Sequence, residues 1–491
     1  MCDEERSANE EQRQPGFENV EIISLEDDVG NKRMKEMPID RLSALPDCLL
    51  IHILSFLGLK KAAITSLLGK KWKFLWTELP TLEFKFWDFS GEKTKANCDF
   101  VARVHKTLAT RSGKSLEKLE VTFKYIECFA SDVDSWLRVA VKLEVKHVVL
   151  SMDYNGDLYT LNKEMCSCSS LTSLSLDGCT IEPQRAISWP SLTSLEIYNV
   201  DLPQPVVENI LSGCPALKSL YLIGCWGFTF LLIKSQNLCE LMVHDPEEAG
   251  GFDFLHISAP FLKSLNIWFR PEKKMKLSQT SSLVSATFHF SDFGGPCSEA
   301  VVSNTKEIFE NTQQVKELEL GRDAMKVYID PLSFSWTQMV KQALAVLLPN
   351  DWQLPKSTRR CLTISSFSNN AESISCIVAL LESSPYLETL IIYCDDSYGK
   401  KKTWIPLAKG DLCCDMPYLK TVKLSDLADA KLEGEPLLTL AQIILKRAPA
   451  LKEMTIEDHN IKGTSEFAKI SQTLLTYPRS SPDAVIFFLP H

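Results

Sequence analysis

The chain has 491 residues, of which 45% are hydrophobic and 24% charged, an ordinary globular composition that excludes a mainly disordered, collagen-like or coiled-coil chain. Its net charge of −10 offers no general basic face to a phosphate backbone, so we expect no nucleic-acid partner. The first residues lack the features of a secretory signal, and no apolar run reaches roughly 18 residues, which favours a protein of the nucleus or cytoplasm without a membrane span.

Residues 1–37 are acidic and contain few residues that could build a core. Residues 1–40 hold 12 acidic and 5 basic side chains, so −7 of the net charge lies in this segment. We expect a flexible acidic tail here.

Residues 39–82 contain short helical runs separated by Pro46, Gly58 and Gly69. Proline suits the first turn of a helix and glycine can end one, so the pattern predicts helices at 46–57, 60–68 and 70–76. Apolar residues surround most of the first helix: Leu49, Leu50, Ile51, Ile53, Leu54, Phe56 and Leu57. A segment of roughly 44 residues is near the lower limit for enclosing its own core, so part of this surface must meet something else.

One leucine-rich pattern recurs from about residue 116 onward, in phrases such as CSSLTSLSL, CPALKSLYL and APALKEMTI. The first apolar anchors of its clearest copies are Leu171, Leu192, Leu217, Leu238, Leu262, Leu283, Val315, Leu387, Leu419 and Leu451. The later anchors of L-x-x-L-x-L alternate on a short strand, and a single turn cannot bury its apolar side without neighbours. The predicted fold is therefore α/β: a small helical region, then a leucine-rich-repeat solenoid of short parallel strands with helical or irregular returns.

The residues also carry a family resemblance. The segment DRLSALPDCLLIHILSFLGLKKAAITSLLGKKWKFLWTELPTLEF resembles the plant F-box motif almost end to end, and the stretch from MPYLKTVKLSDL to LLTYPRSSPDAVIFF resembles the FBD region of plant F-box proteins with leucine-rich repeats. With this resemblance, the predicted domains are the tail at 1–37, an F-box at 38–84, leucine-rich repeats at 100–320, an irregular repeat or connecting region at 321–386, and an FBD region at 387–488 that continues the solenoid.

The resemblance implies the substrate-recognition subunit of an SCF-type ubiquitin ligase. Family F-boxes dock onto a Skp-type adaptor, which is held by a cullin that carries a RING subunit, while the repeats select a protein target. The adaptor contacts implied by the motif are Leu45, Pro46, Leu49, Leu50, Ile53, Leu54, Ser66, Leu67 and Leu68. The alternative is an F-box and repeat scaffold that acts without a cullin and has no role in ubiquitination.

Some F-box positions depart from the family pattern. Gly58 stands where proline is common, Lys61 where an acidic residue is frequent, and Gly69 and Lys71 where serine and arginine are usual. These departures bear on affinity or adaptor choice more than on the fold. The lysines of this segment either steer an acidic adaptor or form a solvated face: Lys60, Lys61, Lys70, Lys71 and Lys73.

Catalytic and metal-binding motifs are missing from the sequence. The 16 cysteines include no C-x-x-C pair, so we expect reduced thiols in the core, no metal site and no cofactor. Cys179 and Cys225, eight residues after their repeat anchors, fit small buried positions. We therefore predict a non-enzymatic protein; an enzyme hidden in residues 321–386 is the remaining alternative.

Target recognition is expected on the repeat strands. Residues between the anchors project to the concave side, which is the usual binding surface of a solenoid. Aromatic residues dominate interface energetics, so the predicted target-binding residues on this side are Tyr198, Tyr221, Trp268 and Tyr393.

Overall fold

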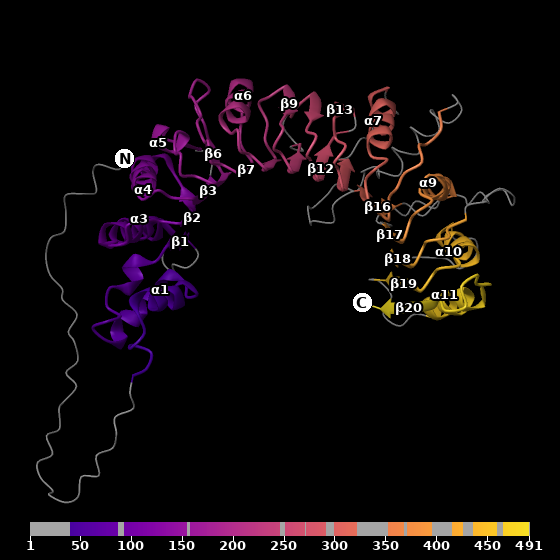
Figure 1. Ribbon diagram of the computed structural model, residues 1–491, viewed down its shortest axis with the longest axis horizontal. Coiled ribbons are helices and arrows are strands. Elements are labelled where there is room, and N and C mark those ends of the chain that lie inside the picture. Colours follow the sequence, from indigo (N-terminus) through magenta and orange to yellow (C-terminus); the bar gives the residue numbers. More distant parts are fainter. Residues whose placement is uncertain are drawn as a thin grey trace, which may run out of the picture.

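The protein is an arch of stacked repeats with a small helical region at its N-terminal end (Figure 1). The computed structural model describes residues 40–86, 93–154, 158–245, 251–270, 272–290, 299–321, 352–367, 371–394, 415–425, 436–458 and 465–490. The predicted tail at 1–37 and residues 322–351 of the predicted connecting region lie outside the described residues.

The helical region contains α1 (Asp47–Ser55) and α2 (Leu59–Ile64), followed by the 3-10 helices η1 (Thr65–Leu68) and η2 (Leu75–Glu78). The predicted helix at 70–76 is wrong, because residues 70–74 form turns. Tertiary contacts hold those turns: Lys71 Nζ donates to the carbonyl oxygens of Ser43 (2.8 Å) and Leu45 (2.6 Å), and Trp72 Nε1 donates to Ser43 Oγ (2.8 Å).

A parallel sheet of fifteen strands lines the inner side of the arch among the described residues. In sheet order its strands are β1 (Thr81–Lys85), β2 (Lys118–Tyr125), β3 (His147–Tyr154), β5 (Ser173–Asp177), β7 (Ser194–Tyr198), β8 (Ser219–Ile223), β10 (Glu240–His244), β12 (Ser264–Phe269), β14 (Ser285–Phe290), β15 (Glu317–Gly321), β16 (Cys361–Phe367), β17 (Thr389–Cys394), β18 (Thr421–Ser425), β19 (Glu453–Asp458) and β20 (Val485–Pro490). All ten predicted repeat anchors are buried at 4% exposure or less. The solenoid prediction is thereby confirmed, and its sheet begins one strand earlier than the pattern indicated, at β1.

Helices cover the outer side of the arch over most of its length (Figure 1). They are α3 (Lys93–Thr110), α4 (Ala130–Lys142), α5 (Lys163–Cys166), α6 (Gln204–Gly213), α7 (Glu299–Asn311), α9 (Ala371–Glu382), α10 (Pro436–Arg447) and α11 (Ser465–Thr476), with the short pair β4 (Tyr159–Thr160) and β6 (Cys179–Thr180). Inward apolar side chains of both layers form one continuous core from Leu82 to Ala484. No helix in the described ranges combines the length and apolar character that a bilayer crossing needs.

The middle of the arch returns by strands instead of helices. β9 (Phe230–Lys234), β11 (Phe254–Ser258) and β13 (Lys274–Ser278) form a second parallel sheet on the outer side. Helix α7 satisfies the outer edge of β13, because Asn304 Oδ1 accepts from Met275 N (3.0 Å) and Glu307 Oε1 from Leu277 N (2.7 Å). This side-chain pairing protects an otherwise open strand edge.

Part of the predicted connecting region belongs to the regular solenoid. β16 pairs in parallel with both β15 and β17, with a register shift between Ile364 and Phe367. α9 follows on the outer side (Figure 1).

Candidate functional site

Helix α1 carries two apolar stripes that face in different directions. Leu50 and Leu54, four residues apart, are fully buried and share a small core with Trp72 and Leu75. Side chains four apart lie on one helix face, so the neighbouring Leu49 forms part of a second, separate stripe. The helical region therefore completes a core of its own with only one side of α1.

The second stripe belongs to a larger exposed apolar surface, which we call the helical apolar surface. Its residues, with exposed fractions, are Leu49 (47%), Ile53 (38%), Phe56 (76%), Leu57 (36%), Ile64 (55%), Leu67 (84%), Leu68 (67%) and Phe74 (64%). They come from α1 and the turn after it, from α2 and η1, and from the turn before η2. Large apolar side chains exposed in this number are typical of protein interaction sites.

The structure distributes the nine motif-implied adaptor residues over three environments. Those exposed are Pro46, Leu49, Ile53, Leu67 and Leu68, and those half-buried are Leu45 and Ser66. Leu50 and Leu54 are buried and support the surface from beneath. The motif did not assign Phe56, Leu57, Ile64 or Phe74 to the site. The spacing from Leu49 and Ile53 could have indicated the first two, but no helical pattern could place Phe74 in a turn.

The lysines of the helical region have different roles. Lys71 is structural, since it bonds two carbonyl groups and lies 3.5 Å from Asp47 Oδ1. Lys60, Lys61 and Lys70 are exposed beside the helical apolar surface, and Lys73 Nζ lies 5.2 Å from the centre of the Phe74 ring. Four cations thus remain at the surface around its apolar side chains.

The helical region is tied to the first repeat by polar contacts. Arg111 Nη1 donates to the Leu79 carbonyl (2.6 Å), and the Thr77 and Ser112 hydroxyl groups lie 2.7 Å apart. The Pro80 carbonyl accepts from the backbone N–H groups that precede and begin β2. These contacts fix the direction in which the arch leaves the helical region.

The inner face of the sheet is acidic in its central part. Among the eight strands from β5 to β16 in sheet order there is no lysine or arginine. The carboxylates on those strands are Asp177, Glu196, Glu240, Glu317 and Glu319. They alternate with buried leucines and isoleucines and therefore project to the inner side.

Two of the predicted target-binding tyrosines are neighbours on this face. Tyr198 on β7 donates to Glu196 Oε2 (3.0 Å), and Tyr221 on β8 donates to Glu240 Oε2 (2.8 Å). Tyr221 lies beside Glu196 in the sheet register. Burial and the adjacent carboxylates raise the pKa of each phenol to about 12, so both stay protonated and act as donors.

The other two predicted target-binding residues lie farther along the sheet. Trp268 on β12 packs between His244 and His289, with ring centroids 5.3 Å and 5.8 Å away. Tyr393 on β17 has Lys423 Nζ 5.8 Å from its ring centre. At about 4.8 Å per strand step, Tyr198 and Trp268 are roughly 14 Å apart. All four residues are half-buried and form an extended strip instead of a single pocket.

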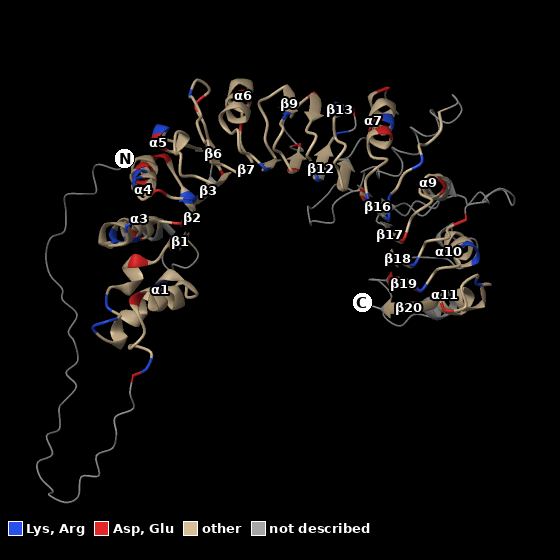
Figure 2. Cartoon of the chain, in the orientation of Figure 1, with Lys and Arg blue, Asp and Glu red and all other residues tan. Residues whose placement is uncertain are grey.

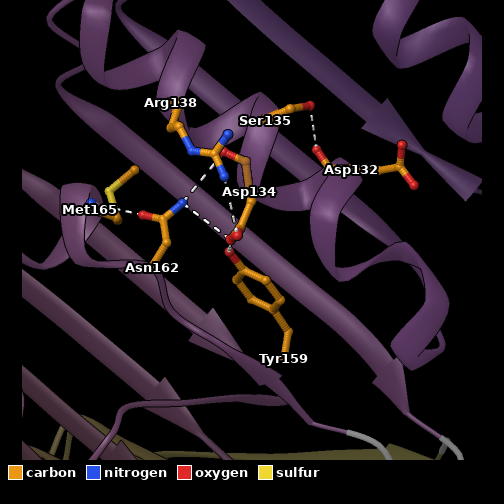
Figure 3. Close-up of polar contacts among 7 residues, drawn as sticks. All are labelled: Asp132, Asp134, Ser135, Arg138, Tyr159, Asn162 and Met165. Carbon is orange, nitrogen blue, oxygen red and sulfur yellow. Dashed lines mark hydrogen bonds and ion pairs between the residues drawn. The ribbon is translucent and has the colours of Figure 1, made fainter.

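A polar cluster on the outer side has a structural explanation. Figure 3 shows Asp134 of α4 accepting from the Tyr159 hydroxyl (2.6 Å) and from Asn162 Nδ2 (3.4 Å), with Arg138 Nη2 at 3.4 Å. Asn162 Oδ1 caps α5 by accepting from Met165 N (2.9 Å). The cluster joins α4, β4 and α5, and burial with the Asp134 contact raises the pKa of Tyr159.

The nearby serine and histidine do not form a hydrolytic triad. Ser135 Oγ donates to the backbone carbonyl of Asp132 (2.7 Å), one turn earlier (Figure 3). His105 Nε2 lies 2.7 Å from the Asp132 carboxylate. The serine hydroxyl thus donates to backbone, and none of its hydrogen bonds within the described residues is to the basic side chain that a nucleophile would require.

The cysteines of the described ranges are core residues or surface thiols. Cys179 and Cys225 are buried, as predicted, and burial raises the pKa of the Cys225 thiol to about 12. Burial likewise raises the pKa of Cys166 to about 11. Within the described residues, no three histidines, cysteines or carboxylates are grouped as metal ligands would be; Cys413 and Cys414 lie outside them.

Comparison with protein families yields two matches. Residues 42–84 match the F-box domain, and residues 107–479 match a leucine-rich-repeat domain described as At1g61320/AtMIF1, LRR domain. The second match alone covers more than two thirds of the chain.

Relatives from Arabidopsis thaliana combine the same two parts. The F-box/LRR-repeat protein At3g03360 is 26% identical over 466 residues, 91% of this chain and 90% of the relative. The F-box/LRR-repeat protein At3g26922 is 31% identical over 256 residues, 50% of this chain and 81% of the relative. The F-box/FBD/LRR-repeat protein At5g56420 is 25% identical over 460 residues, 91% of this chain and 99% of the relative.

Proposed function

The chain belongs to the F-box/leucine-rich-repeat family, and from this premise we propose that it is the substrate-recognition subunit of an SCF-type ubiquitin ligase. Proteins of this family are generally SCF substrate receptors and non-catalytic adaptors. In this proposal the F-box (38–84) binds a Skp-type adaptor held by a cullin and RING subunit. The repeats (100–320), the connecting region (321–386) and the FBD region (387–488) present a protein target.

The helical apolar surface is the observation that carries the proposal. Its most exposed members, Leu67 at 84% and Phe56 at 76%, would each gain about 1.5–3 kcal/mol if fully buried by a partner. Leu50 and Leu54 beneath them fix the helices, so the surface is preformed. Of the nine motif-implied adaptor residues, we propose that Leu45, Pro46, Leu49, Ile53, Ser66, Leu67 and Leu68 make direct contacts and that the two buried leucines position them.

The departures from the family motif are compatible with adaptor binding. Gly58 has φ −57° and ψ 151°, nearly the backbone geometry of Pro46 at the corresponding position before α1 (φ −56°, ψ 148°). A glycine here keeps the turn that proline would impose. The Lys61 side chain is exposed, so its charge is not buried in the core.

The receptor would act by proximity. The polar contacts between the helical region and the first repeat hold the two parts in one orientation, so a bound adaptor and a bound target would keep a fixed separation. Fixed placement raises the effective concentration of a target lysine near the transferred ubiquitin. We propose Tyr198, Tyr221, Trp268 and Tyr393 as target contacts, because they are the half-buried aromatic residues along the inner strip.

Co-purification tests the adaptor assignment. Leu49→Asp with Leu67→Asp changes two exposed residues, and should abolish capture of a Skp-type adaptor without lowering the thermal unfolding temperature. Leu232→Asp on β9 is the matched control, since Leu232 is 46% exposed but lies on the outer side of the arch, and it should retain the adaptor. Undiminished capture by the double variant would refute the proposal.

Co-purification of a cullin distinguishes the SCF receptor from the scaffold alternative. If the chain is an SCF receptor, cullin and RING subunit should co-purify through the adaptor, and ubiquitin transfer to bound proteins should require the cullin. Adaptor binding without recruitment of any cullin would establish the scaffold function instead.

A further inference from the structure

A row of basic residues runs along one edge of the sheet. The residue directly before each inner strand occupies a repeated backbone position, which we call the N-terminal rim: its carbonyl accepts from the N–H groups of the corresponding rim residue and first strand residue of the next repeat. For example, the Lys218 carbonyl accepts from Cys239 N (2.7 Å) and Glu240 N (2.9 Å). The hydrogen bonds therefore place the rim residues in register, one per repeat.

The rim is strongly enriched in cations. From β3 to β19 its residues are Lys146, Thr172, Thr193, Lys218, Cys239, Lys263, Val284, Lys316, Arg360, Glu388, Lys420 and Lys452. Seven of these twelve rim residues are basic, whereas 53 of the 491 residues in the chain are basic, so only one or two basic residues would be expected among twelve. Figure 2 shows blue segments recurring among the inner strands over this part of the arch.

Most of these cations are available to a partner. All seven are exposed. Arg360 and Lys420 share Glu388, with Arg360 Nη1 3.2 Å from Oε1. Among the ion pairs of the described residues, none includes any of the other five rim lysines.

Exposed aromatic residues stand beside the rim. Phe261 (57% exposed), Tyr386 (52%) and Tyr418 (51%) each lie two residues before a rim residue. The rings of Tyr386 and Tyr418 are 5.9 Å apart across neighbouring repeats. The same edge therefore offers apolar contact next to positive charge.

We propose that the N-terminal rim binds an extended acidic segment of the target protein, with apolar side chains interspersed among its carboxylates. At about 4.8 Å per strand step, eleven steps from Lys146 to Lys452 span roughly 50 Å, the length of about fifteen residues of extended chain. The cations would pair with the carboxylates, and Phe261, Tyr386 and Tyr418 would contact the apolar side chains. The inner face, with its own carboxylates, would receive a different part of the target.

A protein segment fits this edge better than a nucleic acid. Glu317 and Glu453 directly follow rim lysines, and the chain as a whole carries −10. A phosphate backbone carries a negative charge at every nucleotide, so some of its charges would be repelled by these carboxylates. A peptide can instead carry acidic side chains opposite the cations and uncharged side chains opposite the carboxylates.

The test uses the full chain without adaptor and a fluorescein-labelled peptide of about 20 residues that repeats Asp-Leu-Glu-Gly. Fluorescence anisotropy should show binding at least about tenfold tighter than that of a Ser-Leu-Asn-Gly peptide, and weakening between about 50 and 300 mM salt. Lys263→Glu with Lys316→Glu should weaken binding about tenfold or more. Lys106→Glu with Lys142→Glu on α3 and α4 makes the same charge change away from the rim and should alter it less than about threefold.

Three results would overturn the proposal. These are equal affinity for the acidic and neutral peptides, equal loss in both charge-reversed variants, and tighter binding of a single-stranded RNA with the same number of charges. The proposal that the rim binds an acidic segment of the target rests on the receptor function. The experiments can nevertheless refute either proposal without refuting the other. Loss of adaptor capture leaves peptide binding intact, and the rim variants should capture adaptor normally.

Discussion

The leucines that repeat along the solenoid are buried, whereas several leucines of the helical region are exposed. Each repeat covers the apolar side of its neighbour, so all ten anchors are buried. Among the described residues, the helical region has no such neighbour over the outer side of α1, where Leu49 is 47% exposed beside the fully buried Leu50. Stacking therefore yields a closed core, whereas the small helical region leaves apolar surface exposed, which we propose a second protein covers.

The largest expected effect contrasts two ion pairs. Lys273 Nζ lies 2.7 Å from Asp245 Oδ2, with side-chain exposures of 9% and 0%, inside the solenoid. Asp245→Asn leaves a buried cation without its charge partner and should lower the free energy of unfolding by about 3–5 kcal/mol in urea titrations. Asp47→Asn removes the exposed pairing with Lys71 and should cost at most about 1 kcal/mol. Similar losses in both variants would contradict the contrast.

A second pair of variants divides α1 itself. Leu50→Ala opens a cavity in the small core and should lower the free energy of unfolding of the helical region by about 2–5 kcal/mol. Leu49→Ala should change it by less than about 0.5 kcal/mol while weakening adaptor binding. Chemical denaturation and adaptor titration measure the two effects separately. A destabilised Leu49→Ala chain would mean that the outer stripe belongs to the protein's own core.

A smaller effect is expected at the turn between α1 and α2. Gly58→Pro fits the existing φ of −57° and restricts the unfolded chain, so it should raise the free energy of unfolding by about 0.4–1 kcal/mol. Adaptor affinity should be unchanged, because the turn keeps its backbone geometry and a Cβ placed there meets nothing of the chain within 4 Å. Thermal melts of the two proteins, at equal concentration, provide the comparison. A lower melting temperature would show that the glycine is required.

The smallest effect concerns pH at the first strands of the solenoid. Burial alone would raise the pKa of Glu120, but hydrogen bonds from Lys118 (2.7 Å) and Lys85 (2.9 Å) outweigh it and lower the pKa. A carboxyl whose folded pKa is depressed contributes stability above its unfolded pKa, and that contribution is lost as pH falls through the folded value. Glu120→Gln should therefore flatten the loss of stability below about pH 4.5. An unchanged pH profile would contradict this.

The repeating pattern predicted the solenoid because spacing alone identifies which residues must be buried together. Leu171 and Leu451 could be placed in one core without knowing the return segments between strands. The strands β9, β11 and β13, which connect inner strands on the outer side of the arch, could not be predicted. Short alternating runs such as FLLIK also fit irregular loops. Their pairing depends on neighbouring repeats and on Asn304 and Glu307 of α7.

The sequence predicted where the apolar surface lies, but not which of its residues are exposed. The sequence indicated too much apolar surface around α1, but Leu49 and Leu50 look equivalent until Trp72 and Leu75 define the inner side. The turn at residues 70–74, set by contacts of Lys71 and Trp72 to residues 43–45, could not be read from local helix signals. That turn exposes Phe74 and thereby enlarges the helical apolar surface.

Hydroxyl-radical footprinting with and without a Skp-type adaptor tests the central claim most directly, because it reports side-chain exposure residue by residue. The account predicts protection of Phe56, Leu67 and Phe74 when the adaptor is added. Phe261 and Leu232, which are 57% and 46% exposed on the solenoid, should react as before. Protection of the solenoid residues with none in the helical region would contradict the account.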